Sequence, residues 1–201
     1  MIRVPLLLAS SSPRRKQILS LLGIPFRSVD PNVDEEIKEG EKPEECACRI
    51  ARAKAMAGRL LAHPNEAVLA ADTLVAIDGA ILGKPSSDEE AFAMLRLLSN
   101  RTHEVWTALA LLLPGSEEVV TTTVRSTVSF APLDESQIAR YLTWGEHLDK
   151  AGAYAVQGLA MGFVESINGS PSNVIGLPAA ELISLLKRAG VIADWPLPRP
   201  C

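Results

Sequence analysis

The residues of this sequence whose types suit chemistry are a small set of cations and carboxylates. The set consists of Arg14, Arg15, Lys54 and Lys84 as cations and of Asp72 and Glu35 as carboxylates. The three histidines and three cysteines form no pattern typical of a zinc site or of an activated nucleophile. Cations and carboxylates without a nucleophile suit the positioning of a polyphosphate and the activation of water with a metal ion, with no covalent step.

The segment SSSPRR, residues 10–15, predicts the start of a helix. Ser11 or Ser12 suits the N-cap, and Pro13 suits the first helical position. The N-terminus of a helix is the positive end of its dipole, so each cation there is disfavoured by ~0.3–1 kcal/mol. Two arginines in the first turn therefore predict a compensating anion, which free backbone N–H groups and serine hydroxyls would also bind. Arginines that point into solvent or pair with a nearby carboxylate are the alternative.

Asp72 and Lys54 each interrupt an apolar pattern, where a charge is costly. A carboxylate inside a buried strand must be paired, bound to metal or neutralised, whereas an aspartate at the end of an edge strand would cap the next turn. The predicted helix over residues 43–61 has an apolar stripe that is expected to be buried, and Lys54 falls in the middle of it. The stripe consists of Ala47, Ile50, Ala51, Gly58 and Leu61. Lys54 either turns inward towards a phosphate or extends its ammonium to water. Lys84, which follows the predicted hairpin, can return to the end of the sheet where Asp72 lies. The acidic loop 33–36 is either solvated or supplies oxygen ligands for Mg²⁺.

The predicted elements alternate between strands and helices. Strands are expected over residues 4–9, 26–29, 68–71, 74–77, 104–113 and 118–131, and helices over 12–22, 43–61, 87–98, 134–143 and 178–188. Asp78-Gly79 predicts a hairpin turn of type I′, and Asn168-Gly169 predicts another turn. Strands interleaved with helices predict an α/β fold with a mixed twisted sheet flanked by helices.

Composition excludes several classes of protein. The chain has 201 residues, of which 47% are hydrophobic and 22% charged, and a net charge of −4. This charge argues against a nucleic-acid partner. No run approaches the ~18 apolar residues of a membrane span, and the first residues do not resemble a signal peptide. Cys46 and Cys48 point to different faces of a helix, so we expect these thiols and Cys201 to be unpaired in a cytoplasmic protein.

Six motifs occur here in the order found in one known family. They are ASSSPRR (9–15), AADT (70–73), GKP (83–85), RTHEVWTALAL (101–111), KAGAYAVQG (150–158) and INGSPSNVIGLP (167–178). The chain thereby resembles the Maf family of nucleoside triphosphate pyrophosphatases from about residue 6 to 188, although Ala108 stands where many members have glycine. The resemblance implies one domain over residues 1–190, and the proline-spaced segment WPLPRPC indicates a tail over 191–201 that has no counterpart in the family. It also implies two lobes around a cleft, as in the inosine triphosphate pyrophosphatases.

The resemblance assigns roles to individual residues. Asp72 matches the family's proton acceptor. The phosphate-site positions are Ser10, Arg15, Lys54 and Lys84, and the site for Mg²⁺ or Mn²⁺ is Glu35 with Asp72. Arg14, Thr73 and Gln157 match the members that act on dTTP and UTP, and the amide of Gln157 has the donor and acceptor that the O4/N3–H edge of uracil and thymine requires.

The implied reaction is hydrolysis of dTTP and UTP to the monophosphate and pyrophosphate by metal-assisted attack of water at the α-phosphate. Its purpose would be the cleaning of nucleotide pools or the arrest of division, and the resemblance implies a homodimer. The alternative is a non-catalytic nucleotide sensor that inhibits septum formation through a protein partner. Two carboxylates favour the enzyme, because a protein that only binds a triphosphate gains nothing from added negative charge.

Overall fold

The computed structural model describes residues 1–198 and is organised around one seven-stranded mixed sheet. The strands lie in the order β2 (Arg27–Val29), β1 (Leu6–Ala9), β3 (Ala67–Ile77), β5 (Thr102–Leu112), β6 (Val119–Phe130) and β7 (Val164–Asn168), with β4 (Ala80–Leu82) paired to the end of β3. β1 is parallel to β2 and β3, and the remaining pairs are antiparallel. The mixed α/β fold predicted from the sequence is therefore confirmed.

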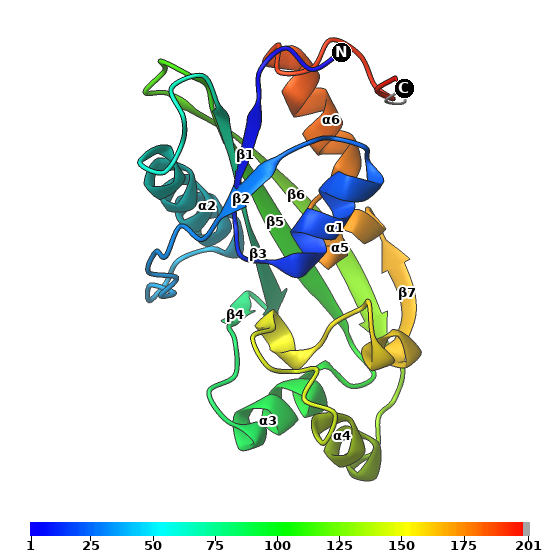
Figure 1. Ribbon diagram of the computed structural model, residues 1–201. Coiled ribbons are helices and arrows are strands. Elements are labelled where there is room, and N and C mark those ends of the chain that lie inside the picture. Colours follow the sequence, from blue (N-terminus) through cyan, green and yellow to red (C-terminus); the bar gives the residue numbers. More distant parts are fainter. Residues whose placement is uncertain (199–201) are drawn as a thin grey trace.

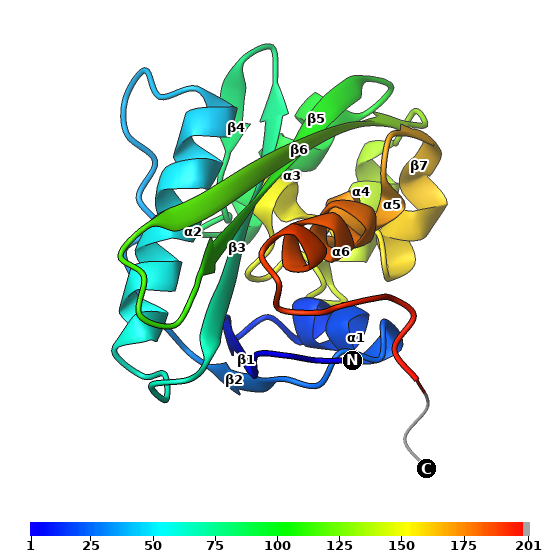
Figure 2. The same cartoon turned by 90° about the horizontal axis from the view of Figure 1, so that it is seen from above.

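Helices divide the molecule into two lobes. They are α1 (Pro13–Leu21), α2 (Pro43–Arg59), α3 (Asp88–Leu98), α4 (Glu135–Leu142), α5 (Pro171–Ile175) and α6 (Ala179–Arg188), with short 3₁₀ helices η1 (Ala151–Ala153) and η2 (Leu159–Phe163). In one lobe α1 and α6 cover one face of the sheet and α2 covers the other (Figures 1 and 2). In the second lobe α3, α4 and η1 pack around the far ends of β3, β5 and β6 (Figure 1).

The first lobe has an apolar core on each face of the sheet and the second lobe has one, and β3 contributes to all three. Leu69 and Ala71 face the core beneath α1 and α6, whereas Val68 and Ala70 face α2. Val75 and Ile77, further along the same strand, belong to the core with α3 and α4. The sequence predicted separate runs at 68–71 and 74–77, which is wrong: Asp72 and Thr73 remain in the ladder with β5, so the strand is continuous.

Gly58 lets α2 lie unusually close to the sheet. A Cβ atom built at Gly58 would stand 2.5 Å from the Cβ of Ala9 and 2.9 Å from Cγ1 of Val68, so no larger residue fits without a shift of the helix. Lys54, one turn earlier, is thereby held against the strand that bears Asp72. The predicted apolar stripe ends at Gly58, because α2 ends at Arg59 and Leu61 is half exposed.

The turn between β3 and β4 has the predicted geometry. Asp78 has φ 51° and Gly79 φ 82°, and a type I′ turn requires positive φ at both of its central residues. The reversal directs the chain through β4 and back to Lys84. The short β7 and α5 were not predicted, because neither is long enough to show a clear period.

Residues 191–198 return to the N-terminal segment. Val191 and Ile192 are buried, and the indole N–H of Trp195 donates to the carbonyl of Leu22 at 3.0 Å. Cys46 and Cys48 are free thiols, as expected, while Cys201 lies outside the described residues. None of the helices in the described part of the chain has the length and apolar character needed to cross a bilayer.

Candidate active site

The two lobes enclose a cavity of about 1200 Å³. Its walls come from the β1–α1 junction, the loop after β2, the middle of α2 and β3, the segment after β4, and the chain around η1. All nine residues singled out in the sequence line it, namely Ser10, Arg14, Arg15, Glu35, Lys54, Asp72, Thr73, Lys84 and Gln157. The structure therefore brings together residues that are spread over nearly 150 positions of the chain.

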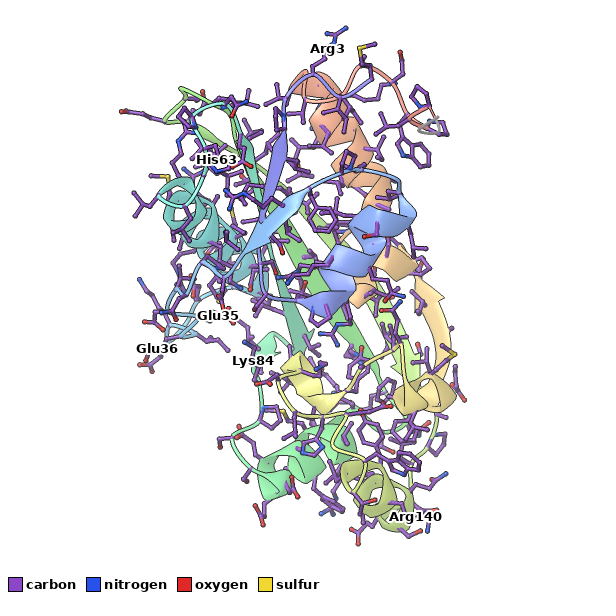
Figure 3. The ribbon with its side chains drawn as sticks, in the orientation of Figure 1. Arg3, Glu35, Glu36, His63, Lys84 and Arg140 are labelled. Atoms are coloured by element: carbon purple, nitrogen blue, oxygen red, sulfur yellow. The ribbon has the colours of Figure 1, made fainter. Side chains whose placement is uncertain are left out.

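Lys54 lies between two carboxylates at the centre of this cavity. Its Nζ is 2.7 Å from Oδ1 of Asp72 and 2.6 Å from Oε1 of Glu35. The other oxygen of Glu35 is 2.6 Å from Nζ of Lys84. Lys54 and Asp72 are 6% and 5% exposed, so the lysine points inward and does not extend to water. Figure 3 shows Glu35 and Lys84 near one another where the lobes meet and Glu36, which is exposed, at the outer edge of the molecule.

Burial and ion pairing act in opposite directions on the two carboxylates. Burial raises the pKa of Asp72, although Lys54 and Arg15 oppose that increase. Burial also raises the pKa of Glu35, but hydrogen bonds from Lys54 and Lys84 outweigh it and lower the value to about 2. Asp72 is the more basic of the two carboxylates because it is the more deeply buried and is bonded to one lysine, whereas Glu35 is bonded to two.

The depressed pKa of Glu35 predicts a pH-dependent contribution to stability. A group whose folded pKa lies below its ordinary 4.5 stabilises the folded state above that pH and loses this effect as the pH falls towards about 2. Glu35→Gln should therefore be less stable than the parent protein at pH 7, and the difference should shrink below about pH 4.5. Urea unfolding at pH 7, 4 and 3 measures this, and a difference that stays constant with pH would contradict it.

Arg15 is buried at the start of α1 and is held by neutral acceptors. Its Nε donates to the carbonyl of Gly176 at 2.9 Å, Nη1 to Oγ of Ser10 at 3.2 Å and Nη2 to Oγ1 of Thr73 at 3.1 Å. Within residues 1–198 no carboxylate forms an ion pair with Arg15 or Arg14. A guanidinium has five N–H donors, so two of those of Arg15 remain available to a ligand. The compensating anion predicted from the sequence is thus not a carboxylate of the described chain.

Arg14 and Gln157 line the cavity, and Thr73 contacts Arg15 directly. Burial and the neighbouring Arg15 lower the pKa of Arg14, whose Nε has no hydrogen-bond partner among the described residues. The Thr73 hydroxyl is bonded to Arg15 and lies 2.9 Å from Oγ1 of Thr107. The side chain of Gln157 is exposed to the cavity. Thr73 therefore lies beside Arg15, the residue that is expected to bind phosphate.

Sequence reasoning missed Glu146, which holds the loop that bears Gln157. Both of its carboxylate oxygens accept the backbone N–H of Leu159, at 3.0 and 2.8 Å. A Cβ atom at Gly158 would stand 2.4 Å from Oε2 of Glu146, so glycine allows the carboxylate to approach. The only signal in the sequence was that the motif KAGAYAVQG ends in glycine.

Glu35 and Asp72 suit a divalent cation. Both carboxylates already contact one cation, the ammonium of Lys54, so they are close enough to act on a common ion. Mg²⁺ is commonly held by one or two carboxylates together with substrate phosphates and water. Within the described residues no group of three or more acidic, histidine or cysteine side chains could hold a metal alone. The donor set therefore fits a metal that is shared with a phosphorylated ligand.

Two solved structures resemble the fold at a distance. The Ham1 protein of Staphylococcus aureus is 21% identical, with 62% of this chain and 72% of that chain covered and a TM-score of 0.39. A nucleoside-triphosphatase / dITP/XTP pyrophosphatase from Mycobacterium abscessus is 20% identical, with coverages of 92% and 90% and a TM-score of 0.40. Both scores are too low to carry an argument about this chain.

Sequence relatives are much closer. A dTTP/UTP pyrophosphatase of Anaeromyxobacter dehalogenans is 45% identical over 195 residues, which make up 96% of this chain and 98% of that protein. A dTTP/UTP pyrophosphatase of Myxococcus xanthus is 46% identical over 192 residues, or 94% and 95% of the two chains. The family model described as Maf-like protein matches residues 5–189. Together with the convergence of the predicted residues on one cavity, these matches show that the chain belongs to the family of Maf-like proteins.

Proposed function

We propose that this protein is a nucleoside triphosphate pyrophosphatase that hydrolyses dTTP and UTP to the monophosphate and pyrophosphate. The observation that carries the proposal is the convergence of Asp72, Lys54 and Arg15 in a cavity of about 1200 Å³. Ligand cavities are typically ~300–1,000 Å³, so this one has room for a nucleoside triphosphate. Relatives 45% and 46% identical over nearly the whole chain, both named dTTP/UTP pyrophosphatase, support the choice of substrate.

Different side chains have different roles in the proposed reaction. Arg15, Lys54 and Lys84 bind the phosphates together with Ser10, which lies between β1 and α1. Asp72 takes a proton from the water that attacks the α-phosphorus. As the new P–O bond forms, the bond from the α-phosphorus to the bridging oxygen breaks and its electrons leave with pyrophosphate. No covalent intermediate with the protein is needed.

Glu35 and Asp72 hold Mg²⁺ or Mn²⁺ in this proposal. The bound ion supplies charge neutralisation at the phosphates and makes water more acidic. Removal of divalent metal with a chelator is expected to abolish pyrophosphate release. Addition of Mg²⁺ or Mn²⁺ should restore it.

Arg14 and Gln157 lie at the base in this proposal, and Thr73 acts beside Arg15. Gln157→Ala is expected to lower kcat/KM for UTP by about 3- to 10-fold, the effect of one lost hydrogen bond. The ratio of kcat/KM for UTP to that for CTP should fall, while inhibition by inorganic tripolyphosphate stays unchanged. Equal loss on every nucleotide would contradict a role at the base.

The proposed function is tested by release of pyrophosphate from a panel of nucleoside and deoxynucleoside triphosphates with Mg²⁺ or Mn²⁺. Release from dTTP and UTP in preference to ATP and GTP is expected. A protein that binds these nucleotides without turning them over would instead be the nucleotide sensor that acts through a partner.

Two further expectations, on the oligomeric state and on the cellular role, belong to the same proposal. The protein is a homodimer, which light scattering on the purified chain measures. Its cellular role is the removal of unwanted nucleotides from the nucleotide pool. An increase of modified pyrimidine triphosphates in a strain that lacks the gene would support this role. An arrest of division that depends on Asp72 would tie the second suggested role to the same reaction.

A further inference from the structure

We propose that Thr107 and Asn173 are positioning residues that fix the direction of Arg15 for phosphate binding. They act through a chain of buried and partly buried hydrogen bonds that begins at the guanidinium and ends at the backbone of α5. This inference rests on the proposed function only in assigning phosphate binding to Arg15. Neither residue lines the cavity, so neither touches the substrate.

The chain of contacts crosses two strands. Nη2 of Arg15 donates to Oγ1 of Thr73 at 3.1 Å, and Oγ1 of Thr73 lies 2.9 Å from Oγ1 of Thr107. Oγ1 of Thr107 in turn donates to the backbone carbonyl of Asn173 at 3.1 Å. Thr73 and Thr107 are register partners in the β3–β5 pair, so their hydroxyls are brought together by the sheet itself.

The two ends of this chain have fixed directions. A guanidinium can only donate and a carbonyl can only accept. When the hydroxyl proton of Thr107 goes to the carbonyl of Asn173, Thr107 accepts from Thr73 and Thr73 accepts from Arg15. Hydrogen bonds that all run in one direction polarise one another, which strengthens the chain as a unit.

Asn173 is the fixed end of the chain. It is fully buried, and its side-chain Nδ2 donates to the carbonyl of Val105 at 3.1 Å and to Oγ of Ser126 at 2.9 Å. These bonds tie α5 to β5 and β6. The same helix is capped by Gly176, whose φ is 118° and whose carbonyl accepts the Nε–H of Arg15 at 2.9 Å. Arg15 is thus held from two sides by one short element.

All the acceptors bonded to Arg15 are neutral, which packing alone would not require. Acceptors that are neutral orient the guanidinium without cancelling its charge, in contrast to Lys54 and Lys84, which are paired with carboxylates. Arg15 therefore retains a full positive charge and two unused donors in a defined direction, which suits a phosphate.

The test compares two variants of one position. Thr107→Val has nearly the shape of threonine but lacks the hydroxyl, whereas Thr107→Ser keeps it. Thr107→Val is expected to raise KM for UTP and dTTP about tenfold, the effect of losing a hydrogen bond that acts on a charged group, with a smaller change in kcat. The preference for UTP over CTP should stay unchanged, and Thr107→Ser should restore KM.

A control distinguishes positioning from a general loss of stability. Thr102 forms a similar hydroxyl pair with Ser129, at 2.8 Å across β5 and β6 but at an exposed position. Thr102→Val should keep the KM of the parent protein even where thermal unfolding shows a comparable loss of stability. An unchanged KM in Thr107→Val, or an equal loss in Thr107→Ser, would overturn the inference.

Binding of inorganic tripolyphosphate, measured by calorimetry, separates this inference from the proposed function. Thr107→Val should bind it about tenfold more weakly than the parent protein, since the affected contact is to phosphate. If the parent protein binds tripolyphosphate but hydrolyses no nucleotide, the proposed function fails while the comparison still decides the role of Thr107. Equal affinity of the two proteins for tripolyphosphate would count against that role.

Discussion

Replacing Asp72 with asparagine is expected to lower kcat for UTP by about 10²–10⁴-fold, the usual contribution of a general base. Asparagine has nearly the same shape and keeps an oxygen that can accept the hydrogen bond from Nζ of Lys54. The fold should therefore change little, and the affinity for tripolyphosphate measured without divalent metal should not fall. The measurements are steady-state kinetics, thermal unfolding and calorimetric binding on the same preparation.

Asp149→Asn is the matched control for this variant. Asp149 lines the same cavity, and its φ of 58° is a conformation that asparagine tolerates well. The control removes a negative charge from the cavity without touching the proposed base, so its kcat should stay close to that of the parent protein. Full activity of Asp72→Asn, or an equal loss in both variants, would show that the base is wrongly assigned.

Replacing Lys54 with methionine is expected to destabilise the protein by about 3–5 kcal/mol at neutral pH, because it leaves a buried carboxylate without its partner. The side chains of Lys54 and Asp72 are both 7% exposed, so water would replace the ammonium only in part. Burial already raises the pKa of Asp72, and loss of Lys54 would raise it further. The loss of stability should therefore be smaller at pH 5 than at pH 8, since protonation of Asp72 removes the uncompensated charge.

The double variant Lys54→Met with Asp72→Asn tests that explanation. It should recover much of the stability lost in Lys54→Met, because the buried charge is gone, but none of the activity. Urea unfolding of the parent protein, both single variants and the double variant gives the coupling between the two residues. A double variant no more stable than Lys54→Met would mean that packing, and not charge, makes Lys54 important.

Prediction from the sequence succeeded best where one residue interrupts a regular pattern. Asp72 and Lys54 stood out because each places a charge in an apolar period, and both prove to be buried. That they contact each other could not be predicted, because the contact depends on how closely α2 lies on β1 and β3. That distance is set by Gly58, whose effect appears only when the helix is packed on the sheet.

Contacts to the backbone left no trace in the sequence. Thr107 donates to a carbonyl of α5, and Glu146 accepts an N–H of η2, so neither partner is identified by its side chain. The expectation that Thr73 faces the base came from the family resemblance alone. In the structure its hydroxyl is bonded to Arg15 and Thr107, so any effect of Thr73 on substrate choice would act through Arg15.

The continuous strands beneath the cavity limit how the molecule can move. β3, β5 and β6 run from the core under α2 into the core under α3 and α4, and their ladder passes directly below Asp72. Movement of the lobes at that level would have to bend this ladder, so we expect it to be smaller than movement of the segments at the rim. We therefore expect entry of the nucleotide and departure of its products to depend on the segments at the rim, residues 30–37 and 145–157. The rate of nucleotide exchange should respond to stiffening of those segments more than to stiffening of the strands that form the floor of the site.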